Sequence, residues 1–109
     1  MPGNVLYEKR GRLAYVTLNR PEVHNCIDVE MSNELIAVWE EIKHDQDVLV
    51  AILTGAGEKA FCSGADLKKL IPYIRGQSEE ENRKRAFQGP GWCGISGGYQ
   101  IHKPVIAAI

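Results

Sequence analysis

The sequence predicts an α/β fold in which strands and helices alternate. Two β-rich segments come first, a helix with apolar residues at 3,4-spacing follows, and a continuous β-rich run comes next. A strand, helix, strand order implies parallel strands joined by a right-handed crossover, and α/β proteins commonly bind ligands where such strands end. With 109 residues, 44% of them hydrophobic, the chain is expected to form one domain.

The first elements are a predicted hairpin and an amphipathic helix. Residues 5–7 and 13–18 have strand patterns, and Gly11 between them supplies the turn. Asp28 is the expected N-cap of the helix. The apolar face of that helix carries Met31, Leu35, Val38, Trp39 and Ile42.

The next strand and two short helices are predicted from local patterns. Residues 48–53 have no polar alternation, which is typical of a strand covered on both faces. A turn at 55–59 and an extended piece at 60–62 lead to a short helix over 66–74, capped by Asp66 and disturbed by Pro72. Ser78 and Glu81 fit a capping box that opens a charged, solvated helix reaching about residue 87.

The last segments are a glycine-rich loop and an apolar strand. Residues 89–98 contain five glycines and a proline, which predicts a loop or lid. Residues 105–109 repeat the buried-strand pattern, with no polar tail after them. Since an uncovered apolar strand is an unusual terminus, we expect a truncated protein.

Charge and cysteine usage exclude several classes of protein. The chain has 13 Lys and Arg against 14 Asp and Glu, so it lacks the basic field that drives binding to nucleic acids or anionic membranes. No apolar run approaches a membrane span, and the first residues do not resemble a signal peptide, so a cytoplasmic protein is expected. Cys26, Cys62 and Cys93 are an odd, widely spaced set that suits reduced thiols.

Residues 61–66 are the most informative candidate site. They bring small residues from the end of an extended segment to the start of a helix, where a ligand can approach the backbone. The N–H of Ser63 and those of the first helical turn are expected to lack partners and to lie at the positive end of the helix dipole. Such donors suit a carbonyl oxygen or an oxyanion, although an ordinary turn capped by Asp66 has the same pattern.

Four motifs in order resemble the crotonase family, also called the enoyl-CoA hydratase/isomerase family. They lie at residues 19–25, 50–55, 59–67 and 103–108. The resemblance implies an α/β fold of the crotonase type, a spiral of ββα units, here truncated. It identifies residues 1–109 as the N-terminal part of a crotonase-like domain.

The resemblance also implies a site for an acyl-CoA thioester, whose carbonyl oxygen is held by two backbone N–H groups. Ser63 matches the first donor, while the second donor and the acid/base carboxylates lie beyond this chain in the family. Such donors stabilise the enolate through which these thioester reactions pass. The residues implied to contact CoA are Gly64, Ala65, Asp66 and Leu67 and, in an earlier loop, Val23 and Asn25.

The function implied by the resemblance is enoyl-CoA hydration, with isomerisation or another crotonase-family reaction as the alternative. Coenzyme A is then part of the substrate, and neither a separate cofactor nor a metal is expected. The full-length protein is expected to form a homotrimer or hexamer. A third hypothesis is a catalytically inert fragment that associates with full-length relatives.

Three residue patterns suggest other roles. Residues 55–60 match the G-x-G-x-x-A dinucleotide fingerprint, but no helix is expected directly after them. Cys62 is either a nucleophile near a helix N-terminus or a buried structural cysteine. Trp92 is a candidate wall of an acyl pocket. His24, His44 and His102 show no metal-ligand spacing.

Overall fold

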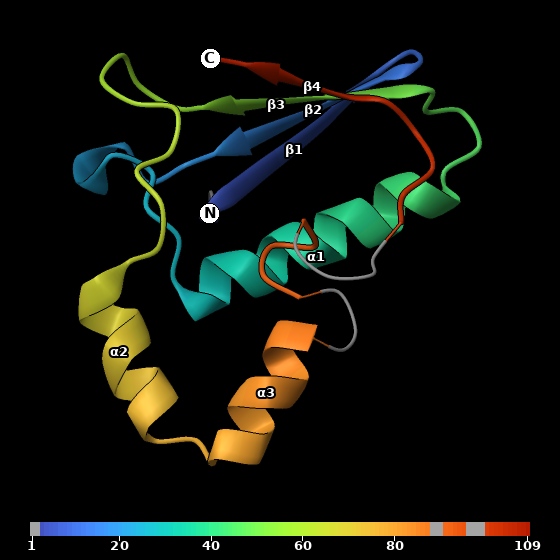
Figure 1. Ribbon diagram of the computed structural model, residues 1–109. Coiled ribbons are helices and arrows are strands. Elements are labelled where there is room, and N and C mark those ends of the chain that lie inside the picture. The colour runs from blue at the N-terminus through green and yellow to red at the C-terminus, as the bar shows by residue number, and fades with distance from the viewer. Residues whose placement is uncertain (1–2, 88–90, 96–99) are drawn as a thin grey trace.

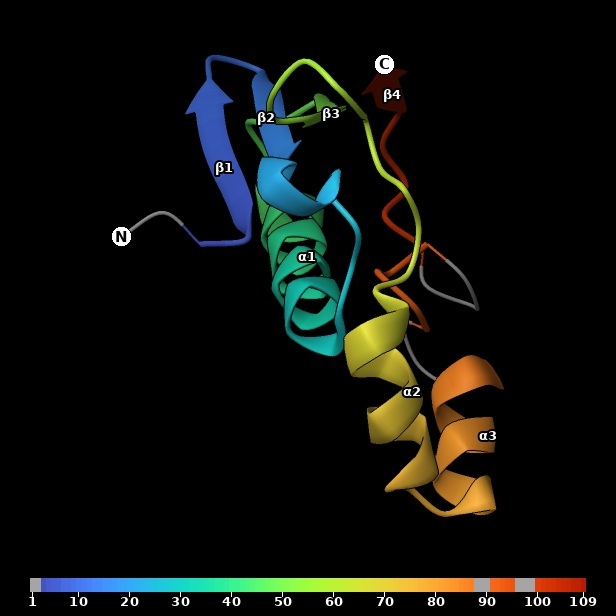
Figure 2. The same ribbon diagram turned by 90° about the vertical axis from the view of Figure 1, so that its left-hand side faces the viewer.

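A four-stranded sheet, a long helix beneath it and a separate pair of short helices make up the fold (Figure 1). The computed structural model describes residues 3–87, 91–95 and 100–109. Helix α1 crosses one face of the sheet, and α2 and α3 form a V on the side of α1 away from the sheet (Figures 1 and 2). In this part of the chain, no helix has the length and apolar character needed to cross a membrane.

The strands lie in the order β1-β2-β3-β4. β1 pairs antiparallel with β2 through a turn in which Gly11 has a φ of 59°, so the predicted hairpin is confirmed. β2, β3 and β4 are parallel, which confirms the predicted crossover arrangement. The strands are β1 (Val5–Arg10), β2 (Leu13–Leu18), β3 (Val50–Gly55) and β4 (Val105–Ala108).

Helix α1 (Val29–His44) is fixed at both ends by side chains. The Asp28 side chain accepts a 2.8 Å hydrogen bond from the N–H of Met31, as the N-cap prediction requires. At the other end the Lys103 ammonium donates to the carbonyls of Ile42 and Asp45, where the negative end of the helix dipole favours a cation.

The core lies between α1 and one face of the sheet. Alternate residues of β2 point into it and meet the apolar stripe of α1, and fully burying each large aliphatic side chain contributes about 1.5–3 kcal/mol. The residues that α1 buries there include four of its five predicted apolar-face positions. The buried hydrophobic residues are Ala14, Val16, Leu18, Ile27, Met31, Leu35, Trp39, Ile42, Val48, Ala51, Leu53 and Cys93.

Two predictions about strands were wrong. β3 alternates in burial, with Ala51 and Leu53 buried and its other face partly exposed, because α1 covers only one side of the sheet. All four residues of β4 are exposed, since nothing in the described part of the chain covers that edge. Residues 60–62, predicted as a short extended piece, lie outside the strands of the sheet.

The short helices are η1 (Pro21–Val23), α2 (Leu67–Arg75) and α3 (Glu79–Phe87). Helices α2 and α3 begin at their predicted caps, Asp66 and Ser78, whereas the short 3-10 helix η1 has no side-chain cap. Pro72 lies inside α2 without ending it, and the Ser78 hydroxyl accepts from the N–H of Glu81 at 3.0 Å. Of the predicted loop over 89–98, the structure describes residues 91–95, and the rest lies outside the described residues.

Candidate functional site

The loop between β2 and α1 is closed by Arg20. Its carbonyl accepts from the N–H groups of Val23 and Asn25, at 3.0 and 2.8 Å. His24 and Asn25 both have a φ of 56°, in the left-handed region that Asn tolerates better than most residues. The loop therefore turns back on itself and directs the His24 carbonyl toward the segment that precedes α2.

Asn25 joins this loop to the turn after β3. Its side-chain amide donates to the carbonyls of Ala56 and Ala60, both at 2.9 Å, and its amide oxygen accepts from the N–H of Arg20. The residue is completely buried, and both amide hydrogens are used. The expected contact of Asn25 with CoA stays a prediction, and the burial of the side chain shows that it also holds the two loops together. Asn25 is part of the scaffold.

Gly55 allows the same turn to pack closely. A Cβ at this position would collide with the carbonyl oxygen of Phe61 and lie 2.8 Å from the Asn25 amide nitrogen. The end of β3 and the approach to Ser63 therefore touch backbone to backbone.

Residues 63–66 run beside residues 24–27. The N–H of Ile27 donates to the carbonyl of Gly64, and the N–H of Asp66 donates to the carbonyl of Ile27, each at 2.7 Å. Ile27 and Ala65 thus form a parallel bridge. These bonds fix the backbone from which the candidate donors project.

The Ser63 N–H donates to the carbonyl of His24 at 3.0 Å. The expectation that this donor lacks a partner was wrong, because the left-handed turn at His24 brings a carbonyl to it. The N–H groups of Ala65, Leu67 and Lys68, in contrast, have no acceptor among the described residues. The unpaired first turn of α2 is therefore present as predicted.

The other predicted contact residues are accessible. Leu67 is 62% exposed and Val23 37% exposed, and Ser63 and Gly64 are also exposed. Gly64 has a φ of 102°, yet nothing lies near the place a Cβ would occupy, so the conformation rather than crowding requires glycine there. Ala65 is half-buried, and the Asp66 side chain is only 11% exposed.

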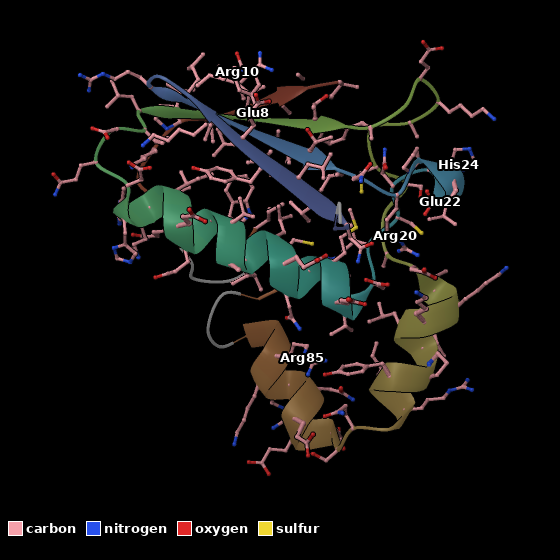
Figure 3. All side chains as sticks on the ribbon, turned by 180° about the vertical axis from the view of Figure 1, so that it is seen from behind. Glu8, Arg10, Arg20, Glu22, His24 and Arg85 are labelled. Atoms are coloured by element: carbon pink, nitrogen blue, oxygen red, sulfur yellow. The ribbon has the colours of Figure 1, made fainter. Side chains whose placement is uncertain are left out.

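A buried ion cluster holds the N-termini of α1 and α2 together. The Arg20 guanidinium is 3.1 Å from the Asp66 carboxylate and 3.6 Å from the Asp28 carboxylate, which also pairs with Lys69 at 3.2 Å. Arg20 donates to the carbonyl of Cys26 as well, at 2.8 Å. Figure 3 shows Arg20 at the end of the molecule where the loop of Glu22 and His24 lies above α2.

The cluster keeps both capping carboxylates charged. Burial by itself raises the pKa of the Asp66 carboxyl, but hydrogen bonds from Arg20 and from the Lys69 N–H bring that pKa below its ordinary value. Burial also raises the pKa of Asp28, and the N–H of Met31, Lys69 and Arg20 together lower it. Two cations thus balance two carboxylates at the helix starts.

Sequence reasoning missed the role of Arg20, although its motif contributes to the family resemblance. The signal was weak because its acidic partners lie 8 and 46 residues further along the chain. An arginine directly after an apolar strand, with N-cap aspartates in two later segments, was the available pattern.

The cysteines and histidines do not assemble a second site in the described residues. The Cys62 sulfur accepts from the Gly64 N–H at 3.4 Å, and burial raises the pKa of Cys93 to about 11, which keeps that thiol protonated. The described residues contain no group of three or more His, Cys, Asp or Glu side chains that could hold a metal. No helix follows residues 55–60 directly, so the dinucleotide fingerprint lacks its structural context.

Two hollows lie near the elements that carry the predicted binding residues. One, of about 320 Å³, is lined by Pro21, His24 and Lys59 among others. The other, of about 560 Å³, lies between α1, α2 and α3, and Trp92 is part of its wall. Trp92 therefore lines this cavity and also packs against the hydrophobic core.

The comparisons with known proteins agree on one family. The model of the enoyl-CoA hydratase/isomerase family matches residues 8–109. The chain is 50% identical over 68 residues to the (E)-benzylidenesuccinyl-CoA hydratase of Thauera aromatica, an alignment that covers 62% of this chain and 27% of that protein. It is 38% identical to the short-chain-enoyl-CoA hydratase of Clostridium acetobutylicum, with 97% of this chain and 38% of that protein covered.

Solved structures show the same relationship. A carnitinyl-CoA dehydratase from Mycobacterium avium 104 superposes with a TM-score of 0.75 at 35% identity, covering 97% of this chain and 39% of that one. EchA1_1 from Mycobacterium paratuberculosis gives a TM-score of 0.74 at 36% identity, covering 95% and 38%. The chain spans less than two fifths of the length of these relatives. The match over nearly all of its residues, with the crotonase fold as far as it extends, shows that this chain belongs to the enoyl-CoA hydratase/isomerase family.

Proposed function

We propose that the protein adds water to the double bond of a 2-enoyl-CoA thioester, with the Ser63 backbone N–H as one donor to the thioester oxygen. The observation that carries this proposal is the fixed backbone at residues 63–67, beside the unpaired first turn of α2, in a chain of this family. A carbonyl oxygen that gains negative charge in the reaction is stabilised by such preorganised donors.

Substrate binding would exchange one acceptor for another at Ser63. The N–H that donates to the His24 carbonyl in this structure would donate to the thioester oxygen instead. The two acceptors are chemically similar, and the exchange requires the His24 carbonyl to move away from Ser63. Gly64, Ala65, Asp66 and Leu67, with Val23 across the loop, would contact the CoA portion.

The test is turnover of crotonyl-CoA by the full-length protein and two Ser63 variants. Ser63→Ala keeps the N–H and is expected to retain activity, whereas Ser63→Pro removes it and should lower the rate about 10²- to 10³-fold. Far-ultraviolet circular dichroism and the thermal midpoint show whether the proline variant is folded. Equal loss of rate in two folded variants would contradict the role of the N–H.

The product distinguishes the remaining possibilities. Formation of a 3-hydroxyacyl-CoA supports hydration, and a shifted double bond supports isomerisation. An inert fragment would show no turnover at any protein concentration. The homotrimeric or hexameric state and the cytoplasmic location remain predictions.

A further inference from the structure

The cavity between α1, α2 and α3 contains an arginine whose charge is incompletely satisfied. The cavity has a volume of about 560 Å³, and its walls include Tyr73 of α2, Arg85 of α3 and Trp92 of the following loop. Figure 3 shows Arg85 on the part of α3 nearest α1. The volume is in the range of small-molecule sites.

Arg85 is held in place by an aromatic ring. Its guanidinium carbon lies 4.3 Å from the centre of the Tyr73 ring, and its Nη2 donates to the Tyr73 hydroxyl. This stacking leaves the in-plane N–H groups available for a planar acceptor. The side chain is therefore oriented by α2.

The second terminal nitrogen of Arg85, Nη1, is buried and has no hydrogen-bond partner among the described residues. Glu81 lines the same cavity but forms no ion pair with Arg85, and Lys84 is paired with Glu80 at 3.5 Å. A buried guanidinium nitrogen without an acceptor is unfavourable in the unliganded protein. A ligand carboxylate would satisfy it.

The opposite wall of the cavity is firmly attached to α1. The N–H of Cys93 donates to the Ser32 hydroxyl at 2.8 Å, and the Trp39 indole donates to the Cys93 carbonyl at 2.9 Å. Trp92, the residue before Cys93, is thus carried on an anchored segment. The wall offers apolar surface to the body of a ligand.

The cavity adjoins a second hollow beside α2. A smaller hollow of about 210 Å³, lined by Asp28 and Lys69 among others, shares Val29 and Tyr73 with the larger cavity. Tyr73 is six residues after Leu67, about 9 Å along the helix axis. A group bound between Arg85 of α3 and Tyr73 of α2 therefore lies about two turns beyond the first residue of α2, the helix that follows the Ser63 segment.

We propose that Arg85 binds a carboxylate carried by the acyl group, so that the substrate is an acyl-CoA with a second acidic group remote from the thioester. This inference rests on the proposed function. Tyr73 orients the guanidinium, and Trp92 provides apolar contact for the acyl body.

Binding of two saturated thioesters to the full-length protein tests the proposal without requiring turnover. Sebacyl-CoA and decanoyl-CoA have the same ten-carbon acyl chain, and only the first ends in a carboxylate. The wild type should bind sebacyl-CoA at least 10-fold more tightly, as measured by calorimetry. Arg85→Gln should remove this preference while leaving the affinity for decanoyl-CoA within about 2-fold.

Two further variants separate charge recognition from a general effect. Arg83→Gln removes a neighbouring exposed cation of α3 that does not line the cavity, and it should keep the preference. Arg85→Lys should restore part of it. Equal affinities in the wild type, or equal weakening of both ligands by Arg85→Gln, would overturn the proposal. Absence of enoyl-CoA turnover would contradict the proposed function. The role of Arg85 would still be decided by the binding comparison, which does not depend on turnover.

Discussion

Arg20 and Asp66, 46 residues apart, meet at 3.1 Å in a nearly buried ion pair. The pair joins the loop that contains His24 to Asp66, the residue that caps α2. Ser63 lies three residues before Asp66 and donates its N–H to the His24 carbonyl of the same loop. The geometry of the Arg20–Asp66 pair therefore influences the distance between the Ser63 N–H, which is the candidate oxyanion donor, and the His24 carbonyl, which accepts from it in this structure.

Replacing Arg20 should destabilise the protein and loosen the site. Arg20→Gln leaves the Asp28 and Asp66 carboxylates with less compensation in a buried setting, and a loss of about 3 kcal/mol in the free energy of unfolding is expected. Urea denaturation measures it. Arg12→Gln, which changes an exposed arginine, should stay within about 0.5 kcal/mol. Similar values for the two variants would show that the cluster contributes little.

Stability should fall in acid as the same cluster is protonated. The pKa values of Asp28 and Asp66 are both below the ordinary value of 3.8, so the unfolded chain binds protons more readily than the folded one. The stabilisation is present above that value and is lost as the pH falls through the lower, folded pKa values.

Urea denaturation between pH 5 and pH 3 measures this dependence. Asp28→Asn should be less stable than the wild type at pH 5 and should lose less of its remaining stability by pH 3. The assignment to these carboxylates fails if the wild type and the variant lose stability in parallel.

Asn25 should be required for folding and not for ligand affinity. Asn25→Ala leaves the carbonyls of Ala56 and Ala60 without their donor, and it places alanine in a left-handed conformation. A loss of roughly 2–4 kcal/mol in the free energy of unfolding follows. Asn33→Ala, at an exposed position of α1, is the control and should change little.

Ligand affinity distinguishes the scaffold role from the direct contact implied by the family resemblance. The folded fraction of Asn25→Ala should bind CoA thioesters with an affinity close to that of the wild type. A much weaker affinity at unchanged stability would restore Asn25 to the binding surface.

The sequence predicted those parts of the fold that depend on neighbouring residues. Asp28 and Asp66 cap α1 and α2 as expected, and Gly11 closes the hairpin. Each of these interactions spans a few residues, so the pattern contains both partners. The family motifs located the 63–67 segment for the same reason.

The exposure of strands β3 and β4 depends on which other elements pack against their faces, and the sequence did not predict it. The apolar runs of β3 and β4 predicted cover on both faces, but α1 packs on one face, and the whole of β4 is accessible. A hydrophobic run shows that burying the side chains of the strand against another element is favourable. It does not specify which element provides that cover.

The sequence by itself determined the α/β order of elements, the helix caps and the family. Tertiary structure decided that Ser63 donates to His24, that Asn25 is enclosed, that Arg20 joins two helix starts, and that Arg85 stacks on Tyr73 beside a cavity. Caps and turns are set by short-range hydrogen bonds. These other contacts join segments brought together by packing, and their partners cannot be chosen from local sequence.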